Sequence, residues 1–261
     1  MLNYEQIGSP VAEIVTKTKN KDDPKVKNKV VYLANDYEED QVQNPLDQID
    51  LGPNEEFQQV PDDRERNILY VTGASGSGKS YYSANYIKEY VKRHSKNKVY
   101  LFSSVKDDSV LDKIKQVKRV DINLPDFLTE DFAINDFQDT LLIFDDTDCI
   151  SDRRLMKKVQ GILDIALQTG RHTNTFVVYT SHTACAGLQT KLILNESHST
   201  TFFVNGMGGR AITYLLGGYL GLTKKQIEVV KAIKSRWVTI LKTYPQLVMS
   251  TKMLTPTKNL Q

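Results

Sequence analysis

Cysteine and long apolar runs are both scarce in this chain of 261 residues. Its two cysteines, Cys149 and Cys185, are too few for a disulfide framework and lack the paired spacing of zinc ligands. A reducing compartment is therefore expected. No stretch reaches the roughly 20 apolar residues that a membrane helix needs, and the polar Asn3, Glu5 and Gln6 do not fit a signal peptide. We expect a soluble protein without a membrane segment.

The net charge of +2 conceals an uneven distribution along the chain. Residues 1–66 hold 15 acidic and 8 basic side chains, a balance of −7, whereas residues 67–261 hold 17 and 26, a balance of +9. From Asn205 onward there are nine Lys or Arg residues and a single acid, Glu228. A basic C-terminal third fits a polyanionic partner, although a solvated lysine-rich face would have the same composition.

A glycine-rich segment follows the short apolar run Ile68–Val71. Residues Gly73–Ser80 have the pattern G-x-x-x-x-G-K-[ST], which is typical of a phosphate-binding loop. Glycines let the backbone curl so that its N–H groups surround phosphate oxygens, and the following helix adds partial positive charge. Lys79 is predicted to reach the β- and γ-phosphates, and the Ser80 hydroxyl to bind Mg²⁺. The candidate nucleotide-binding residues are Gly73, Ala74, Ser75, Gly76, Ser77, Gly78, Lys79, Ser80 and Tyr81.

The chain is expected to have three parts. Residues 1–60 read as an appendage that is partly extended or mobile, residues 61–252 as a P-loop ATPase domain, and residues 253–261 as a C-terminal tail. Within the middle part, apolar runs alternate with helical patterns, which predicts an α/β fold with a mainly parallel sheet flanked by helices.

Three local patterns complete the expected fold. A helix is predicted around residues 107–117. Thr223–Gln226 fits a capping box that opens another helix. Residues 237–241 and 246–250 are expected to form a C-terminal β-hairpin that turns at Tyr244-Pro245.

Two carboxylates follow the most apolar strand candidate, Thr140–Phe144. A phosphate loop needs an acidic partner for Mg²⁺ and for the attacking water. We assign Asp145 to Mg²⁺ and Asp146 to the role of general base or water-positioning group. A capping or surface role is the alternative for Asp146, because Asp148 and Asp152 lie nearby in the sequence.

Adenine is the expected base. Asn20–Asp23 imitates a guanine-specificity motif, but it lies upstream of the phosphate loop, where such a motif cannot serve. No D-x-x-G motif follows Asp145. ATP and Mg²⁺ are therefore the predicted cofactors.

The strand candidate Phe176–Tyr179 leads to a polar tip, with Ser181 and His182 as alternative γ-phosphate sensors. In P-loop ATPases of this layout this strand lies between the phosphate-loop strand and the acidic strand. Arg171, just before it, is the first candidate for an arginine finger that reaches a neighbouring subunit. The competing arginines are Arg153, Arg154 and Arg210.

Several segments together resemble one family. They are Gly73–Ser80, Leu141–Asp146, Thr169–His172, Asn195–Ser199, Leu222–Gln226, Arg236-Trp237 and Tyr244–Gln246, in this order. The set is similar to the genome-packaging ATPases of large DNA viruses and virophages, the poxvirus-type branch of the FtsK–HerA superfamily. The resemblance covers about residues 60–252, and its Gly-Arg-His and C-terminal motifs are more specific than the phosphate loop.

The resemblance implies a RecA-like core that assembles as a ring, commonly a hexamer, and translocates double-stranded DNA into a preformed capsid by hydrolysing ATP. It also implies a capsid or portal vertex partner, and a location in the host cytoplasm, the viral factory or the virion. Many superfamily members have Gln where this chain has Ser181-His182, so the sensor stays open. DNA contacts independent of base sequence are expected from Lys224, Lys225, Lys231, Lys234 and Arg236.

Two other functions fit the same phosphate loop. A nucleotide or small-molecule kinase would also need an Arg-rich lid, and the pair Arg153-Arg154 is not where a lid is expected. An ATP-switched DNA-binding or scaffold protein would bind nucleotide without acting as a motor.

Overall fold

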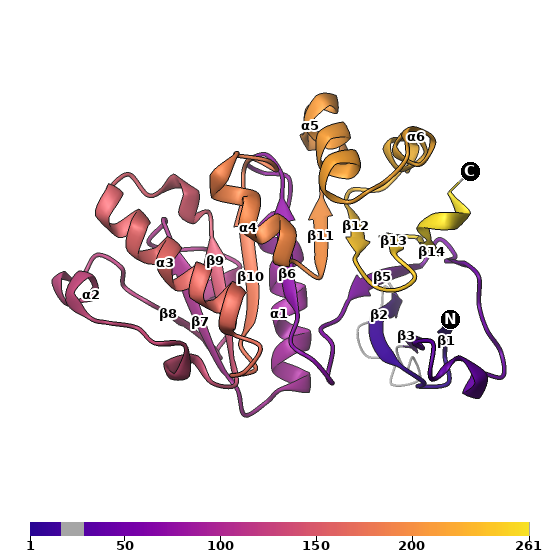
Figure 1. Ribbon diagram of the computed structural model, residues 1–261, viewed down its shortest axis with the longest axis horizontal. Helices are drawn as coiled ribbons and strands as arrows, with labels where there is room; N and C mark the ends of the chain where they lie inside the picture. The colour runs from indigo at the N-terminus through magenta and orange to yellow at the C-terminus, as the bar shows by residue number, and fades with distance from the viewer. Residues whose placement is uncertain (17–28, 261) are drawn as a thin grey trace.

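The computed structural model describes residues 1–16 and 29–260 and contains one large mixed sheet (Figure 1). Its ten strands lie in the order β4-β14-β13-β12-β11-β6-β10-β9-β7-β8. The parallel strands are β6 (Ile68–Thr72), β7 (Lys98–Ser103), β8 (Val117–Arg119), β9 (Thr140–Asp145), β10 (Phe176–Ser181) and β11 (Ser199–Phe202). The helices are α1 (Lys79–Arg93), α2 (Pro125–Thr129), α3 (Arg153–Thr169), α4 (Leu188–Glu196), α5 (Gly209–Tyr214) and α6 (Lys224–Ala232). The predicted α/β fold with a mainly parallel sheet is confirmed.

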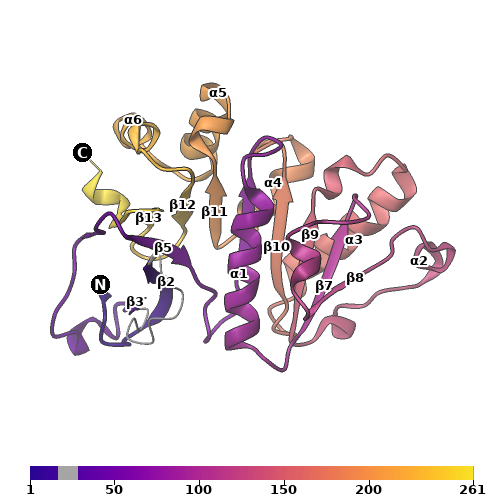
Figure 2. The ribbon, with the colours of Figure 1, turned by 180° about the vertical axis from the view of Figure 1, so that it is seen from behind.

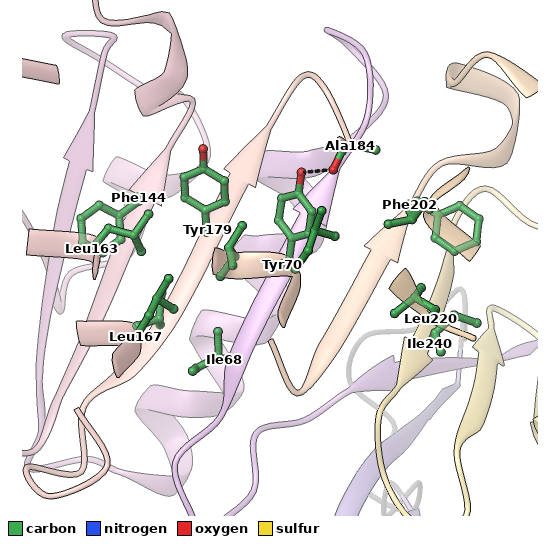
Figure 3. Close-up of a cluster of buried hydrophobic side chains, with 14 of the residues drawn as sticks. Ile68, Tyr70, Phe144, Leu163, Leu167, Tyr179, Ala184, Phe202, Leu220 and Ile240 are labelled. Carbon is green, nitrogen blue, oxygen red and sulfur yellow. Dashed lines mark hydrogen bonds between the residues drawn. The ribbon is translucent and has the colours of Figure 1, made fainter. Parts of the chain in front are cut away.

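Helices cover both faces of the parallel part of the sheet. Helix α1 packs on one face, and α3 and α4 pack on the other (Figures 1 and 2). Side chains of a strand alternate between faces, so Leu69 and Val71 contact the α1 cluster, whereas Tyr70 belongs to the opposite cluster with Tyr179 and Leu163 (Figure 3). Strands buried on both faces read as continuous apolar runs, which is why β6, β9 and β10 were recognisable in the sequence. In the part of the chain described, no helix is both long and apolar enough to cross a membrane.

The prediction of a helix around residues 107–117 is wrong. Only a short 3-10 turn, Leu111–Lys113, forms there, and Val117 begins the edge strand β8 beside β7. The Asp108 carboxylate accepts the backbone N–H groups of Val110 and Leu111, both at 2.7 Å. Local side-chain bonds of this kind compete with the helical hydrogen-bond ladder.

The C-terminal strands extend the sheet on the other side of β11. The predicted hairpin is confirmed as the antiparallel pair β12 (Val238–Leu241) and β13 (Leu247–Ser250). A further strand, β14 (Met253–Pro256), pairs antiparallel with β13 and buries Leu254. Residues 253–256, which were expected to begin a separate tail, therefore form part of the sheet.

The N-terminal segment forms a second, antiparallel sheet of four strands. Its order is β1 (Leu2–Asn3), β3 (Lys29–Leu33), β2 (Ser9–Thr16) and β5 (Glu55–Gln59), while β4 (Ile49–Asp50) joins the large sheet beside β14. The second sheet packs on the C-terminal strands, because Val11 and Phe57 share an apolar cluster with Leu247 and Met249. The described part of the appendage is thus extended and anchored; the guanine-like motif Asn20–Asp23 lies outside the described residues.

A buried polar contact also ties this segment to α1. The Tyr82 hydroxyl donates to Gln59 Oε1 at 2.8 Å and lies 2.9 Å from the Thr239 hydroxyl.

We expect Tyr82→Phe to reduce the free energy of unfolding by about 1–3 kcal/mol, because it leaves the buried Gln59 oxygen without its donor. Urea unfolding measures the change. Tyr37→Phe is the control, since Tyr37 is 94% exposed. Equal unfolding midpoints for the two variants would contradict the expectation.

Candidate active site

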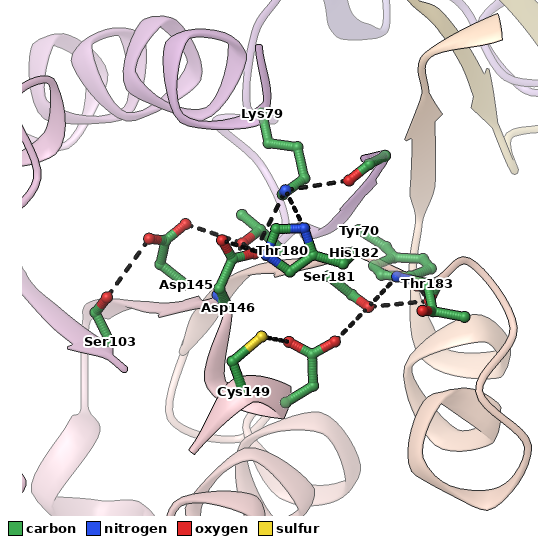
Figure 4. A network of polar contacts seen from close by, with 12 residues as sticks. Tyr70, Lys79, Ser103, Asp145, Asp146, Cys149, Thr180, Ser181, His182 and Thr183 are labelled. Carbon is green, nitrogen blue, oxygen red and sulfur yellow. Dashed lines mark hydrogen bonds and ion pairs between the residues drawn. The ribbon is translucent and has the colours of Figure 1, made fainter. Parts of the chain in front are cut away.

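Three strand ends bring the candidate catalytic residues to one edge of the sheet. Strand β10 lies between β6 and β9 and is parallel to both, as predicted. The carboxyl ends of parallel strands meet at one edge, which is where open α/β sheets bind ligands. The phosphate loop therefore follows β6 beside Asp146 and His182, which follow β9 and β10 (Figure 4).

The phosphate loop adopts a backbone that only some residues tolerate. Gly78 has a φ of +113° immediately before Lys79, the first residue of α1. The Lys79 side chain is buried, and its Nζ donates to the carbonyl oxygen of Gly73 at 3.1 Å. The buried Ser77 hydroxyl has no hydrogen-bond partner among the described residues, so a phosphate oxygen would satisfy it. These features fit a nucleotide phosphate.

The remaining predicted loop residues differ in exposure. Ala74, Ser75 and Gly76 are exposed at the tip of the loop, and Ser80 is half-buried in the first turn of α1. Tyr81 is 63% exposed.

Asp145 is a buried carboxylate, with 2% of its surface exposed. The Thr180 hydroxyl donates to its Oδ1 at 2.9 Å, and the Ser103 hydroxyl lies 3.5 Å from its Oδ2. Burial, reinforced by the neighbouring charge of Asp146, raises the pKa of Asp145 to about 6. A carboxylate with few donors and a large desolvation penalty is suited to receive a cation.

Asp146 connects the other charged groups. Its φ of +48° is uncommon for a residue with a side chain, and its backbone N–H donates to the Thr180 hydroxyl at 3.0 Å. One carboxylate oxygen lies 3.5 Å from Lys79 Nζ, and the other lies 3.1 Å from His182 Nε2. Lys79 Nζ is also 3.2 Å from His182 Nδ1 (Figure 4).

This geometry selects one form of the imidazole. An ammonium group can only donate, so His182 Nδ1 must accept from Lys79. The proton then resides on Nε2 and is donated to Asp146. His182 therefore lies between the lysine of the phosphate loop and the candidate base.

The two candidate sensors separate in the structure. The Ser181 hydroxyl is turned toward Asp148 Oδ2, at 3.0 Å, and the backbone of Thr183, at 2.9 and 3.1 Å. Of the pair, His182 is the residue that contacts Lys79 and Asp146.

The arginines lie at different edges of the sheet. Arg171 precedes β10 and lines a cavity of about 480 Å³ with Arg66 and His198, at the edge opposite the phosphate loop. A residue before a parallel strand lies at the amino edge of the sheet, so Arg171 is at the opposite edge from its own subunit's phosphate loop. Its action on a neighbouring subunit stays a prediction. The alternatives Arg153, Arg154 and Arg210 follow β9 or β11 and lie toward the edge of the phosphate loop.

Three features of the site were not predicted from the sequence: the Thr180 and Ser103 hydroxyls beside Asp145, and the contact of Arg236 with the phosphate loop. Thr180 was detectable as the first polar residue after the apolar run of β10. Arg236, which was expected to contact DNA, donates from its Nε to the carbonyl oxygen of Ser77 at 3.2 Å. Its contact with DNA stays a prediction. No local pattern relates residues so distant in the sequence.

Comparison with known proteins identifies one relative by sequence. The chain is 39% identical over 246 residues to the uncharacterized protein V3 of Sputnik virophage, and the match covers 94% of each protein. No protein-family profile matches the chain.

Two of the solved structures that match the chain are of viral genome-packaging proteins. The DNA-packaging ATPase B204 of Sulfolobus turreted icosahedral virus matches with a TM-score of 0.50 and 16% identity, over 71% of this chain and 97% of B204. B204 of Sulfolobus turreted icosahedral virus 2, in complex with ATPγS, matches with a TM-score of 0.49 and 16% identity. The match covers 71% of this chain and 98% of that B204 chain. The likeness at 0.50 shows a shared fold. The identity to V3 shows more, since it spans nearly the whole of both proteins: the chain belongs to the family of the Sputnik virophage protein V3.

Proposed function

We propose that this protein is an ATPase that drives double-stranded DNA into a preformed capsid, within the packaging branch of the FtsK–HerA superfamily. The observation that carries the proposal is the contact of Lys79 with both Asp146 and His182 beside the phosphate loop. The fold, which is shared with a DNA-packaging ATPase, supports it. The sequence motifs within residues 60–252 also support the proposal.

The residues of the site have distinct proposed roles. The loop backbone and Lys79 hold the phosphates, and Ser80 with Asp145 would hold Mg²⁺. Bound Mg²⁺ would neutralise charge that develops on the phosphates. Asp146 orients the attacking water and accepts its proton. His182 joins Lys79 to Asp146, so a change in the hydrogen bonds of Lys79 reaches the base.

The proposed DNA contacts lie on α6, which sits on the same side as the phosphate loop (Figures 1 and 2). Lys224 and Lys225 are exposed on α6, Lys234 is exposed just after its end, and Lys231 pairs with Glu228 at 2.9 Å. The capping box of Thr223 and Gln226 fixes the start of this helix. Such a lysine-rich surface contacts phosphates without reading bases.

The proposal includes a ring of identical subunits, commonly a hexamer in this superfamily, with Arg171 or one of its alternatives acting between subunits. Residues 61–252 would carry the ATPase and residues 1–60 an accessory sheet. A capsid or portal vertex partner and a location in the host cytoplasm or viral factory belong to the same proposal.

The first prediction separates binding from hydrolysis. Lys79→Ala should abolish both nucleotide binding and hydrolysis. Asp146→Asn should keep binding but lower the hydrolysis rate by about 100-fold or more, because the general base is lost. Steady-state ATP hydrolysis and fluorescent-nucleotide binding measure the two effects. Asp152→Asn is the control, since Asn still caps α3. Wild-type turnover in Asp146→Asn would remove Asp146 from the mechanism.

The second prediction concerns the sensor. His182→Ala should lower kcat by roughly 10-fold or more with little change in nucleotide affinity, because His182, unlike Ser181, contacts both Lys79 and Asp146. Ser181→Ala should change kcat less than about threefold, since Ser181 bonds to Asp148 and Thr183. Steady-state kinetics tests the pair, and equal losses in the two variants would refute the assignment.

The third prediction uses the raised pKa of Asp145. The folded protein retains a proton on Asp145 that the unfolded chain loses at lower pH, so this contribution to stability disappears as pH rises through about 6. Asp145→Asn cannot ionise and still accepts from Thr180. As the pH rises from 5 to 8 without divalent cations, the free energy of unfolding of the variant should increase by roughly 1–2 kcal/mol relative to that of wild type. Urea unfolding measures the difference. If the free energies of unfolding of wild type and Asp145→Asn change with pH in the same way, Asp145 does not titrate in this range.

A further inference from the structure

Arg236 reaches the phosphate loop from the short connection between α6 and β12. Its Nε donates to the carbonyl oxygen of Ser77 at 3.2 Å. Its guanidinium packs against Gly78, where a Cβ would lie only 3.0–3.2 Å from the guanidinium atoms. The side chain is exposed, and it forms no ion pair within residues 1–16 and 29–260. A charged group without an acidic partner thus rests on the loop that is proposed to hold phosphates.

The backbone that carries Arg236 is anchored on both sides. The Ser235 hydroxyl donates to the Trp237 carbonyl at 2.7 Å and accepts the Thr251 backbone N–H at 3.1 Å. The Trp237 ring meets the Tyr82 ring of α1 edge-on, with centroids 5.0 Å apart. Helix α6 ends at Ala232, shortly before this segment. Arg236 therefore has a fixed base from which to hold the loop.

The contact determines how one peptide group of the loop is turned. In a planar trans peptide the C=O and the next N–H point in opposite directions. Since Arg236 holds the carbonyl oxygen of Ser77 on its own side, the N–H of Gly78 is directed away from Arg236. Backbone N–H groups of a phosphate loop bind phosphate oxygens, so this orientation affects how tightly the loop binds phosphate.

We propose that Arg236 is a positioning residue that orients the Ser77–Gly78 peptide for phosphate binding and links the loop mechanically to the end of α6. This inference rests on the proposed nucleotide binding. Because α6 carries exposed lysines, the same side chain connects the surface proposed for DNA to the nucleotide site. The guanidinium is required rather than a positive charge alone, since a planar group packs on Gly78 and a lysine ammonium does not.

Equilibrium binding of Mg·ATPγS tests the positioning role without relying on turnover. Arg236→Ala should bind about 10-fold more weakly, and Arg236→Lys should recover less than half of that loss on a logarithmic scale. Arg64→Ala is the matched control, because Arg64 is an exposed arginine that pairs with Glu38 in the N-terminal segment; it should stay within about twofold of wild type.

Hydrogen exchange tests the mechanical link. In the wild type, Mg·ATPγS should slow amide exchange in both residues 73–80 and residues 233–237. In Arg236→Ala at saturating nucleotide, only residues 73–80 should be protected. Equal protection of residues 233–237 in both proteins would overturn the link.

The outcomes also separate this inference from the proposed function. Wild-type affinity in Arg236→Ala, or full recovery by Arg236→Lys, overturns the positioning role while the ATPase proposal stands. A wild-type protein that fails to bind ATPγS at all overturns the ATPase proposal itself.

Discussion

The parallel pairing of β10 between β6 and β9 is the constraint on which the site depends. Its register sets Ser181 opposite Thr72 on β6, and the N–H of Gly73 donates to the carbonyl of Ser181 at 3.1 Å. The residue after Ser181 is therefore level with the start of the phosphate loop, where the Gly73 carbonyl receives Lys79. A slip by one residue would turn every side chain of β10 to the other face and separate Thr180 from Asp145.

The two most buried charged groups of the site are compensated to different degrees. Lys79 and Asp145 are almost fully buried, and an isolated buried ion costs several kcal/mol. Lys79 is shared among Gly73, Asp146 and His182, whereas Asp145 has only hydroxyl donors, which leaves its pKa raised. The Thr180 hydroxyl has one proton for two carboxylates, and the shorter distance, 2.9 Å against 3.2 Å, favours Asp145. The positive φ of Asp146 is strain stored at the same point.

The loop is also held from its other side by residues distant in the sequence. Tyr82, one turn into α1, bonds to Gln59 of the N-terminal sheet and to Thr239 of β12, and its ring meets Trp237. Arg236 contacts the loop itself. The accessory sheet and the C-terminal strands therefore form a support for α1, and the nucleotide site lies between this support and the strand ends of β9 and β10.

The sequence alone determined the elements whose signals are local. The glycine spacing of residues 73–80, the apolar runs that end in Asp145 and His182, and the capping box at Thr223 each arise from the backbone and side chains of a few neighbouring residues. Tertiary structure decided the rest: that Arg171 lies at the opposite edge, that residues 253–256 join the sheet, and that Arg236 rests on Gly78. Those outcomes depend on strand direction and on contacts between residues far apart in the chain, and neither periodicity nor composition records such contacts.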